Sequence, residues 1–194
     1  MMDFTGEDCY GLYKNSRNAA WHTIIDYEIK ELPVSTTSIA YKMNAAVIPY
    51  SDRLPPPQPG MTGHAEFVKG QWRLFFAPET LASGRARFTL AHEIGHILLG
   101  HRLQNGTFHD DLAEEAAANM YAARLLAPAC VLWALDLHTP EEISAITGLS
   151  IQSAGFRARL LRELRKRDRF LTSPLEQQVY RQFLPFIESI KQKR

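Results

Sequence analysis

The sequence predicts an α+β fold: a small antiparallel or mixed sheet packed on a helix that carries HEIGH, followed by a largely helical C-terminal half with a helix-turn-helix-like element. Two observations predict this class. Strand patterns occur only before residue 80, and helical periodicity dominates after residue 86. Strands followed by a run of helices are typical of α+β proteins.

Two helices and one strand are expected at the start of the chain. Residues 17–28 place apolar side chains on one helical stripe, and Pro33 stops any continuation. Ser35 or Thr36 then caps a second, short helix. Residues 45–50, AAVIPY, form a short apolar run, which favours a strand.

A loop and a β-hairpin are expected next. Residues 54–60, LPPPQPG, are predicted to be an exposed loop, because proline lacks the amide donor that helices and central strands use. HAEFV at 64–68 and QWRLFF at 71–76 read as strands. Only Lys69 and Gly70 separate them, which favours a tight hairpin turn.

Helices account for most of the remaining chain. Gly100 suits the left-handed position after one helix, and Pro128 stops another. Thr139-Pro140 has the pattern of a helix start, with a cap and then a proline. The expected helices run from about 87 to 99, from 111 to 127, from Thr139 to Gly148, from Ser150 to 167, and from Ser173 to 190.

Composition and charge allow one main core and give no reason to expect chain-wide attraction to nucleic acid or membrane. The chain has 194 residues, 45% apolar, with 22 Lys plus Arg against 21 Asp plus Glu. Cys9 and Cys130 lie far apart, so neither a disulfide scaffold nor a thiolate zinc site is expected. The chain start lacks a signal-peptide pattern, and no apolar run approaches the roughly 20 residues that span a bilayer. A cytoplasmic protein is expected.

The segment FTLAHEIGHILLGH contains the main candidate site. Residues four apart on a helix lie one turn apart on one face, so His92 and His96 can both reach one zinc ion at ~2.1 Å. Glu93 lies at the edge of that face and is the candidate catalytic base for metal-bound water. The rival interpretation is two histidines and a solvated glutamate at a helix surface. The apolar neighbours favour the metal site, because buried ionisable side chains need partners.

A catalytic zinc ion normally has three protein ligands and one open position. His101 does not complete the longer pattern HExxHxxGxxH, which needs glycine at position 99 and histidine at 102. The next helix offers Glu114 and Glu115. Glu115 is the expected metal ligand because it shares a face with Asn119, which could orient a ligand histidine. Glu114 is expected to be an ordinary acid near a helix N-terminus.

Two stretches of the chain carry a resemblance to a known family: RFTLAHEIGHILLGH and EAAANMYAARLLAP. They are similar to the ImmA/IrrE family of metallopeptidases, whose pattern is approximately RFTLAHELGH and then E-x-x-A-N-x-F-A-A-x-L-L-M-P. Residues 31–52, ELPVSTTSIAYKMNAAVIPYSD, resemble the family's N-terminal element, and residues 144–164, SAITGLSIQSAGFRARLLREL, resemble its C-terminal helix-turn-helix-like element, so the resemblance covers most of the chain. The departures from the pattern are Tyr121 in place of the usual phenylalanine and Ala127 in place of methionine. We expect a zinc metallopeptidase domain over residues 1–135 and a helical C-terminal region, packed on it, over residues 136–194.

The resemblance implies a zinc (Zn²⁺) metalloendopeptidase of the HExxH-plus-Glu type. His92, His96 and Glu115 would be the zinc ligands and Glu93 the general base. It also implies a cytoplasmic anti-repressor, which inactivates a helix-turn-helix transcriptional repressor, often by one cleavage, in a mobile element or a stress response.

A basic segment near the C-terminus leaves a second class of function open. Seven of the thirteen residues from Arg157 to Arg169 are basic, an arrangement that resembles a DNA-reading helix. The favoured interpretation is a basic face that meets solvent or an acidic partner, since helix-turn-helix geometry is also a common packing unit. The alternative function is a non-catalytic regulatory protein that acts on DNA or on a repressor through this helix.

The last predicted helix has an apolar stripe, which favours docking onto the core over a dimer or partner surface. The stripe consists of Leu175, Val179, Phe183, Phe186 and Ile190. Histidines without a paired spacing are expected to be structural or exposed. They are His22, His64, His109 and His138.

Overall fold

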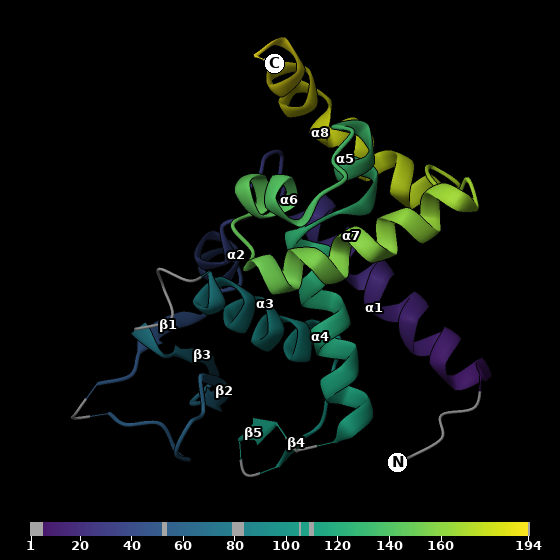
Figure 1. Cartoon of the computed structure of the whole chain (residues 1–194). Helices are drawn as coiled ribbons and strands as arrows, with labels where there is room; N and C mark the ends of the chain where they lie inside the picture. The colour runs from purple at the N-terminus through teal and green to yellow at the C-terminus, as the bar shows by residue number, and fades with distance from the viewer. Residues whose placement is uncertain (1–5, 52–53, 79–83, 105, 109–110, 194) are drawn as a thin grey trace.

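The computed structural model describes residues 6–51, 54–78, 84–104, 106–108 and 111–193, and it confirms an α+β fold (Figure 1). The sheet lies at one side of the molecule and the C-terminal helices at the other. Helices α3 (Arg85–Leu98) and α4 (Leu112–Leu126) lie between these two parts and pack against each other. The predicted site residues fall on these two central helices.

The first two helices pack on this centre. α1 (Gly6–Asp26) begins eleven residues before the predicted start and packs along α4. α2 (Thr36–Lys42) contacts α3, and its N-cap is Ser35, whose hydroxyl accepts a hydrogen bond from the Ser38 N–H at 3.2 Å. The predicted cap is therefore confirmed, and the predicted start of the first helix is wrong.

The sheet is mixed and has the strand order β1-β3-β2-β5-β4. β1 (Ala46–Pro49) pairs in parallel with β3 (Gln71–Phe76), and the other pairings are antiparallel. β2 (Gly63–Val68) lies next to β3, and both strands contact α3, the helix that carries HEIGH. The short strands β4 (Leu103–Gln104) and β5 (Thr107–Phe108) extend the sheet beyond β2.

The predicted hairpin and loop are both present. Lys69 and Gly70 join β2 to β3 with positive φ angles of 50° and 82°, as the turn that matches strand twist requires. Residues 54–60 form neither helix nor strand, apart from an isolated bridge between Leu54 and Ser51. These features agree with the sequence interpretation.

The helix starts of the C-terminal half follow the predicted capping residues. α6 (Pro140–Thr147) begins with a complete capping box from Thr139, and Gly148 ends it with φ 67°. Ser150 caps α7 (Ile151–Lys166), which packs against α6. Ser173 likewise caps α8 (Pro174–Gln192). The likeness of the α6–α7 pair to a helix-turn-helix element stays a prediction.

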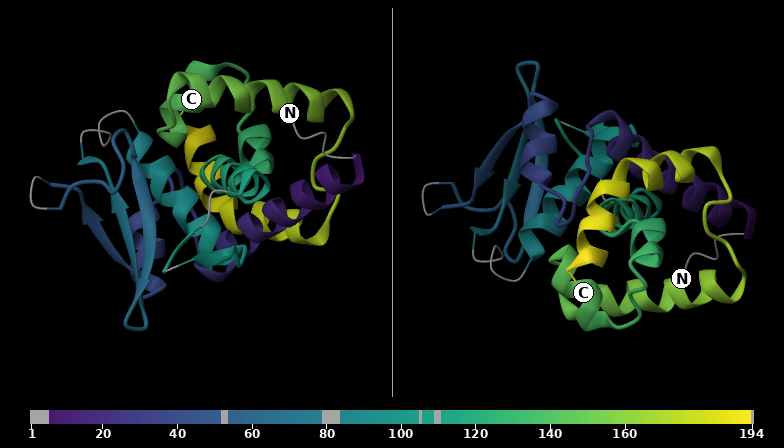
Figure 2. Two further views of the ribbon diagram at one scale, coloured as in Figure 1. Left: turned by 90° about the horizontal axis from the view of Figure 1, so that it is seen from below. Right: turned by 90° about the horizontal axis from the view of Figure 1, so that it is seen from above.

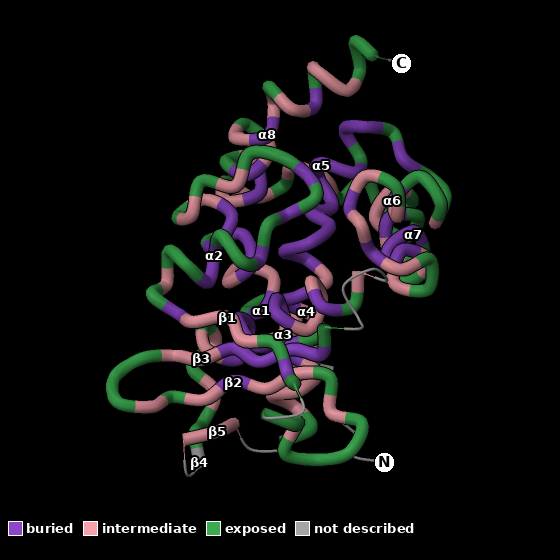
Figure 3. The backbone as a smooth tube through the Cα atoms, turned by 90° about the vertical axis from the view of Figure 1, so that its left-hand side faces the viewer, coloured by how far each residue is buried: buried purple, intermediate pink, exposed green. Residues whose placement is uncertain are grey.

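One buried cluster joins both halves of the chain (Figure 3). It extends from Ala20 on α1 to Ile187 on α8, and α8 contributes Val179 and Phe183 as well. The predicted docking of the last helix is confirmed, whereas the division after residue 135 stays a prediction. Among the described residues, no helix is both long and apolar enough to cross a membrane.

Candidate metal centre

Gly95 allows the two central helices to approach closely. A Cβ atom built there would lie 2.7 Å from Tyr121 Cδ1 and 3.4 Å from the Ala118 Cα atom, so a side chain would push α4 away. The glycine of HEIGH therefore has a packing role: it brings the first turns of α4 within reach of the histidines on α3.

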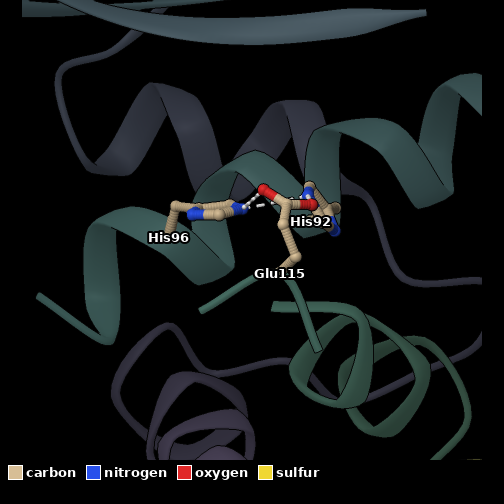
Figure 4. Close-up of side chains that lie close together, drawn as sticks. All are labelled: His92, His96 and Glu115. Carbon is tan, nitrogen blue, oxygen red and sulfur yellow. Dashed lines mark hydrogen bonds and ion pairs between the residues drawn. The ribbon is translucent and has the colours of Figure 1, made fainter. Parts of the chain in front are cut away.

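The three predicted ligands converge. The Nε2 atoms of His92 and His96 are 3.0 Å apart. Glu115 Oε2 lies 3.3 Å from His92 Nε2, and Glu115 Oε1 lies 3.1 Å from His96 Nε2 (Figure 4). In a tetrahedral zinc site with ligand distances of about 2.1 Å, ligand atoms are about 3.4 Å apart. The donor set and its spacing thus fit one metal ion, and these three residues form a group that could hold one.

Hydrogen bonds at the far side of each imidazole orient the rings. His92 Nδ1 lies 3.1 Å from Asn119 Oδ1, which can only accept, so His92 donates there and its Nε2 lone pair faces the cluster. His96 Nδ1 lies 2.9 Å from His101 Nδ1. Donation by His96 in this pair leaves its Nε2 lone pair free as well, which is the tautomer that a metal ligand needs.

His101 is a contact of the site that the motif analysis missed. It follows Gly100, which has φ 70°, and its N–H donates to the His96 carbonyl at 3.1 Å. This chain reversal after α3 returns the side chain to His96. The sequence sign for this contact was a histidine directly after the glycine that ends the helix. The position of His101 does not fit the longer motif HExxHxxGxxH.

Charge coupling among the three candidate ligands is strong. Burial lowers the pKa of His92, but the hydrogen bond to Glu115 and nearby negative charge raise it above the ordinary value overall. Burial, followed by the charge of His92, lowers the pKa of His96 to about 4. The hydrogen bond from His92 lowers the pKa of Glu115. The carboxylate and the two imidazoles therefore lie close enough to shift one another's pKa values.

Glu93 lies beside the cluster, with only 7% of its surface exposed. Burial raises its pKa to about 7, the charge of His92 opposes this, and the N–H of Ala65 on β2 also stabilises the carboxylate. A cavity of about 350 Å³ opens in front of Glu93, His92 and Glu115. A carboxyl group with a pKa near neutrality at such a cavity can accept and return a proton.

The other acid on α4 points elsewhere. Glu114 Oε1 lies 3.5 Å from the Arg102 N–H, and Glu114 is not part of the ligand cluster. This arrangement agrees with the expectation that Glu115, and not Glu114, faces the histidines.

A second histidine network lies on the sheet near Glu93. His64 Nδ1 is 2.6 Å from the Tyr50 hydroxyl, and the His64 ring stacks on Phe75 at 4.4 Å. Burial, then the charges of Glu93 and Glu66, raises the pKa of Tyr50 to about 12. His64 therefore has partners, as expected for a structural histidine.

Two of the remaining single histidines, His22 and His138, are not among the residues of the ligand cluster. His22 is exposed, and His138 Nε2 contacts Asp136 at 2.8 Å on the surface. His109 lies outside the described residues.

Comparison with protein families gives one match. Residues 46–159 match the family model Peptidase_M78, described as the IrrE N-terminal-like domain. The matched region begins at β1 and ends within α7, so it contains every residue of the ligand cluster and Glu93. A search among curated proteins finds no similar sequence.

Proposed function

The chain belongs to the IrrE N-terminal-like peptidase family, Peptidase_M78, and from this membership we propose that it is a zinc-dependent metalloendopeptidase that hydrolyses a peptide bond in a protein partner. The observation that carries the proposal is the convergence of His92, His96 and Glu115 on one point beside Glu93. Three protein ligands leave one coordination position of a tetrahedral ion open, as in catalytic zinc sites and unlike structural ones.

The proposed reaction combines the metal with one carboxylate. Zinc, when bound, supplies a Lewis acid that acidifies water and polarises the scissile carbonyl group. Glu93 accepts the proton as the water oxygen attacks the carbonyl carbon. The same carboxyl group then protonates the nitrogen of the leaving amine as the C–N bond breaks, so that Glu93 returns to its starting state.

Burial of Glu93 supports this role. The carboxylate is held by the Ala65 N–H, which fixes its direction, and burial raises its pKa to about 7 in the metal-free protein, from which a bound cation would lower it. The ideal general base has a pKa near the working pH, because it must be ionised at the start and still retain a proton later.

We propose a transcriptional repressor of the helix-turn-helix type as the protein substrate, and a cytoplasmic anti-repressor role in a mobile element or stress response. The support for this finer statement is the family resemblance. Fold and site geometry alone support a class of reaction rather than a partner, since one fold hosts many substrates.

A cleavage assay with matched variants tests the function. Wild-type protein loaded with zinc is incubated with candidate repressors, beside Glu93→Gln and Glu114→Gln. We expect Glu93→Gln to lose nearly all cleavage while it retains zinc, and Glu114→Gln to keep both. Full cleavage by zinc-loaded Glu93→Gln would refute the general-base role.

The exposed basic residues of the C-terminal segment favour one alternative, a regulatory protein that binds DNA without catalysis. Arg159, Arg162 and Lys166 are exposed on α7, whereas Arg157 is buried and Arg165 donates to the Leu137 carbonyl at 3.0 Å. Binding through phosphate contacts weakens steeply as salt rises. Tight, strongly salt-dependent DNA binding combined with no cleavage of any repressor would favour this alternative.

A further inference from the structure

A second cavity, of about 480 Å³, shares no described lining residue with the cavity at the metal centre. It lies where α1, α4 and α7 approach one another, and both views of Figure 2 show α1 and α7 on different sides of the central helix α4. Positive charge dominates its lining. The charged residues there are Arg17, Arg124, Arg157, Arg167, Arg169, Glu163 and Glu176.

Two of these arginines are deeply buried, each with 6% of its surface exposed. Arg157 Nε donates to the Ala127 carbonyl at 2.6 Å. Arg124 Nη1 donates to the Met120 carbonyl at 2.7 Å, and its guanidinium lies 4.1 Å from the centre of the Tyr13 ring. Within the described part of the chain, neither guanidinium forms an ion pair with a carboxylate.

The two acids at the cavity are engaged elsewhere. Glu163 Oε1 forms an ion pair with Lys166 Nζ at 2.9 Å. Glu176 Oε2 accepts a hydrogen bond from the Thr172 N–H at 3.2 Å at the start of α8. Neither carboxylate therefore neutralises the two buried guanidinium groups.

Two buried cations without an anion are an unusual arrangement, because buried charges are normally paired. Burial, then the charge of Arg124, lowers the pKa of Arg157 to about 10, and burial lowers the pKa of Arg124. Both groups still carry their charge at neutral pH. An anion in the cavity would offset their desolvation and their mutual repulsion.

We infer that this cavity binds a small phosphate ester, with its phosphate group against the guanidinium groups of Arg124 and Arg157. A phosphate carries up to two negative charges and three acceptor oxygens, which matches two adjacent guanidinium forks better than a single carboxylate does. The volume lies in the usual range for small-molecule sites. Leu160 and Leu164 provide apolar surface for the organic part of the ligand.

A small molecule fits better than nucleic acid, because both arginines line the cavity and are almost fully buried, beyond the reach of a rigid duplex. The inference is independent of the proposed peptidase activity. The site would bind its ligand whether or not the chain cleaves proteins.

Calorimetric titration of the full-length, zinc-loaded protein tests the inference. The probes are inorganic phosphate and adenosine monophosphate, with succinate as a dianion of carboxylate type, all at constant ionic strength. We expect saturable binding of adenosine monophosphate by the wild type. In Arg124→Met we expect affinity to fall about tenfold or more, because a charge-assisted hydrogen bond is lost.

Arg162→Gln is the matched control, because Arg162 is an exposed arginine of α7 outside the cavity lining, and it should bind like the wild type. If near-ultraviolet circular dichroism shows that Arg124→Met does not fold, Arg17→Gln at the rim takes its place, again with weaker binding expected. The inference fails if no phosphate probe binds, if succinate binds as tightly as adenosine monophosphate, or if the cavity variant retains wild-type affinity. The last result would place the anion elsewhere, for example at the metal.

Discussion

Replacement of Gly95 by alanine should weaken both the fold and the metal centre. The added Cβ would lie 2.7 Å from Tyr121 Cδ1, about 0.7 Å closer than ordinary contact, and Tyr121 is fully buried. Overpacking of this kind costs about 1–3 kcal/mol, while alanine gains about 1 kcal/mol over glycine in helix propensity. We therefore expect the free energy of unfolding to fall by up to about 2 kcal/mol, and α4 to move away from α3.

Gly155→Ala is the matched control for helix propensity. Gly155 is also helical, but the nearest atom to its added Cβ would be Pro140 Cγ at 3.9 Å, an ordinary contact. Urea unfolding of the metal-free proteins should then show Gly95→Ala less stable than Gly155→Ala by about 1–3 kcal/mol. Zinc affinity should fall only in Gly95→Ala. Equal stabilisation of both variants, with unchanged zinc affinity, would refute the argument that this glycine positions the ligand helix.

Three further predictions concern single contacts. Tyr121→Phe should lower the free energy of unfolding in urea by about 0.5–1.5 kcal/mol, because its buried hydroxyl is 2.8 Å from the Thr23 hydroxyl; an unchanged midpoint would contradict this. Asn119→Ala and His101→Ala should each weaken zinc binding about 10–100-fold in a competition titration with a chelator, because Asn119 and His101 each contact the ring of a ligand histidine. Wild-type zinc affinity in both variants would contradict this orienting role. Backbone N–H groups at the start of α6 hold the pKa of Glu142 below its usual 4.5. Glu142→Ala should therefore be less stable than the wild type at pH 7, and the difference in urea midpoint should shrink as the pH falls through that lowered pKa. A difference in midpoint that does not depend on pH would contradict the capping role of Glu142.

Elements with local sequence signs were predictable. The capping residues Ser35, Thr139 and Ser150 each mark a real helix start, because a cap is a contact between residues only a few positions apart. The hairpin at Lys69 and Gly70 is local in the same sense. Caps and tight turns can be predicted without knowledge of the rest of the chain, because the residues that form them are close together in sequence.

Elements without such signs were missed or misplaced. α5 (Ala129–Ala134) follows Pro128 directly, and its six apolar residues are too few to show helical periodicity. The N-terminal half of α1 contains two glycines and many polar residues, and its contact with α4 comes from residues far away in sequence. The two-residue strands β4 and β5 are too short to show alternation.

The candidate site likewise has some features that the local sequence predicts and others that arise only from tertiary packing. The spacing of His92 and His96 on one helix is a local pattern, and the face that Glu115 shares with Asn119 separated it from Glu114. The Ala65 N–H at Glu93 arises from the packing of a strand against a helix, which periodicity does not reveal. Periodicity does not reveal the second cavity either, because its arginines come from three helices and a connecting segment.

The most direct test of the account is the zinc content of the purified protein by elemental analysis, for the wild type, Glu115→Ala and Glu114→Ala side by side. The account predicts about one zinc ion per chain in the wild type and in Glu114→Ala, and a loss of zinc in Glu115→Ala. Full zinc content in Glu115→Ala, or no zinc uptake by the wild type even after zinc is added back, would contradict the proposed metal centre.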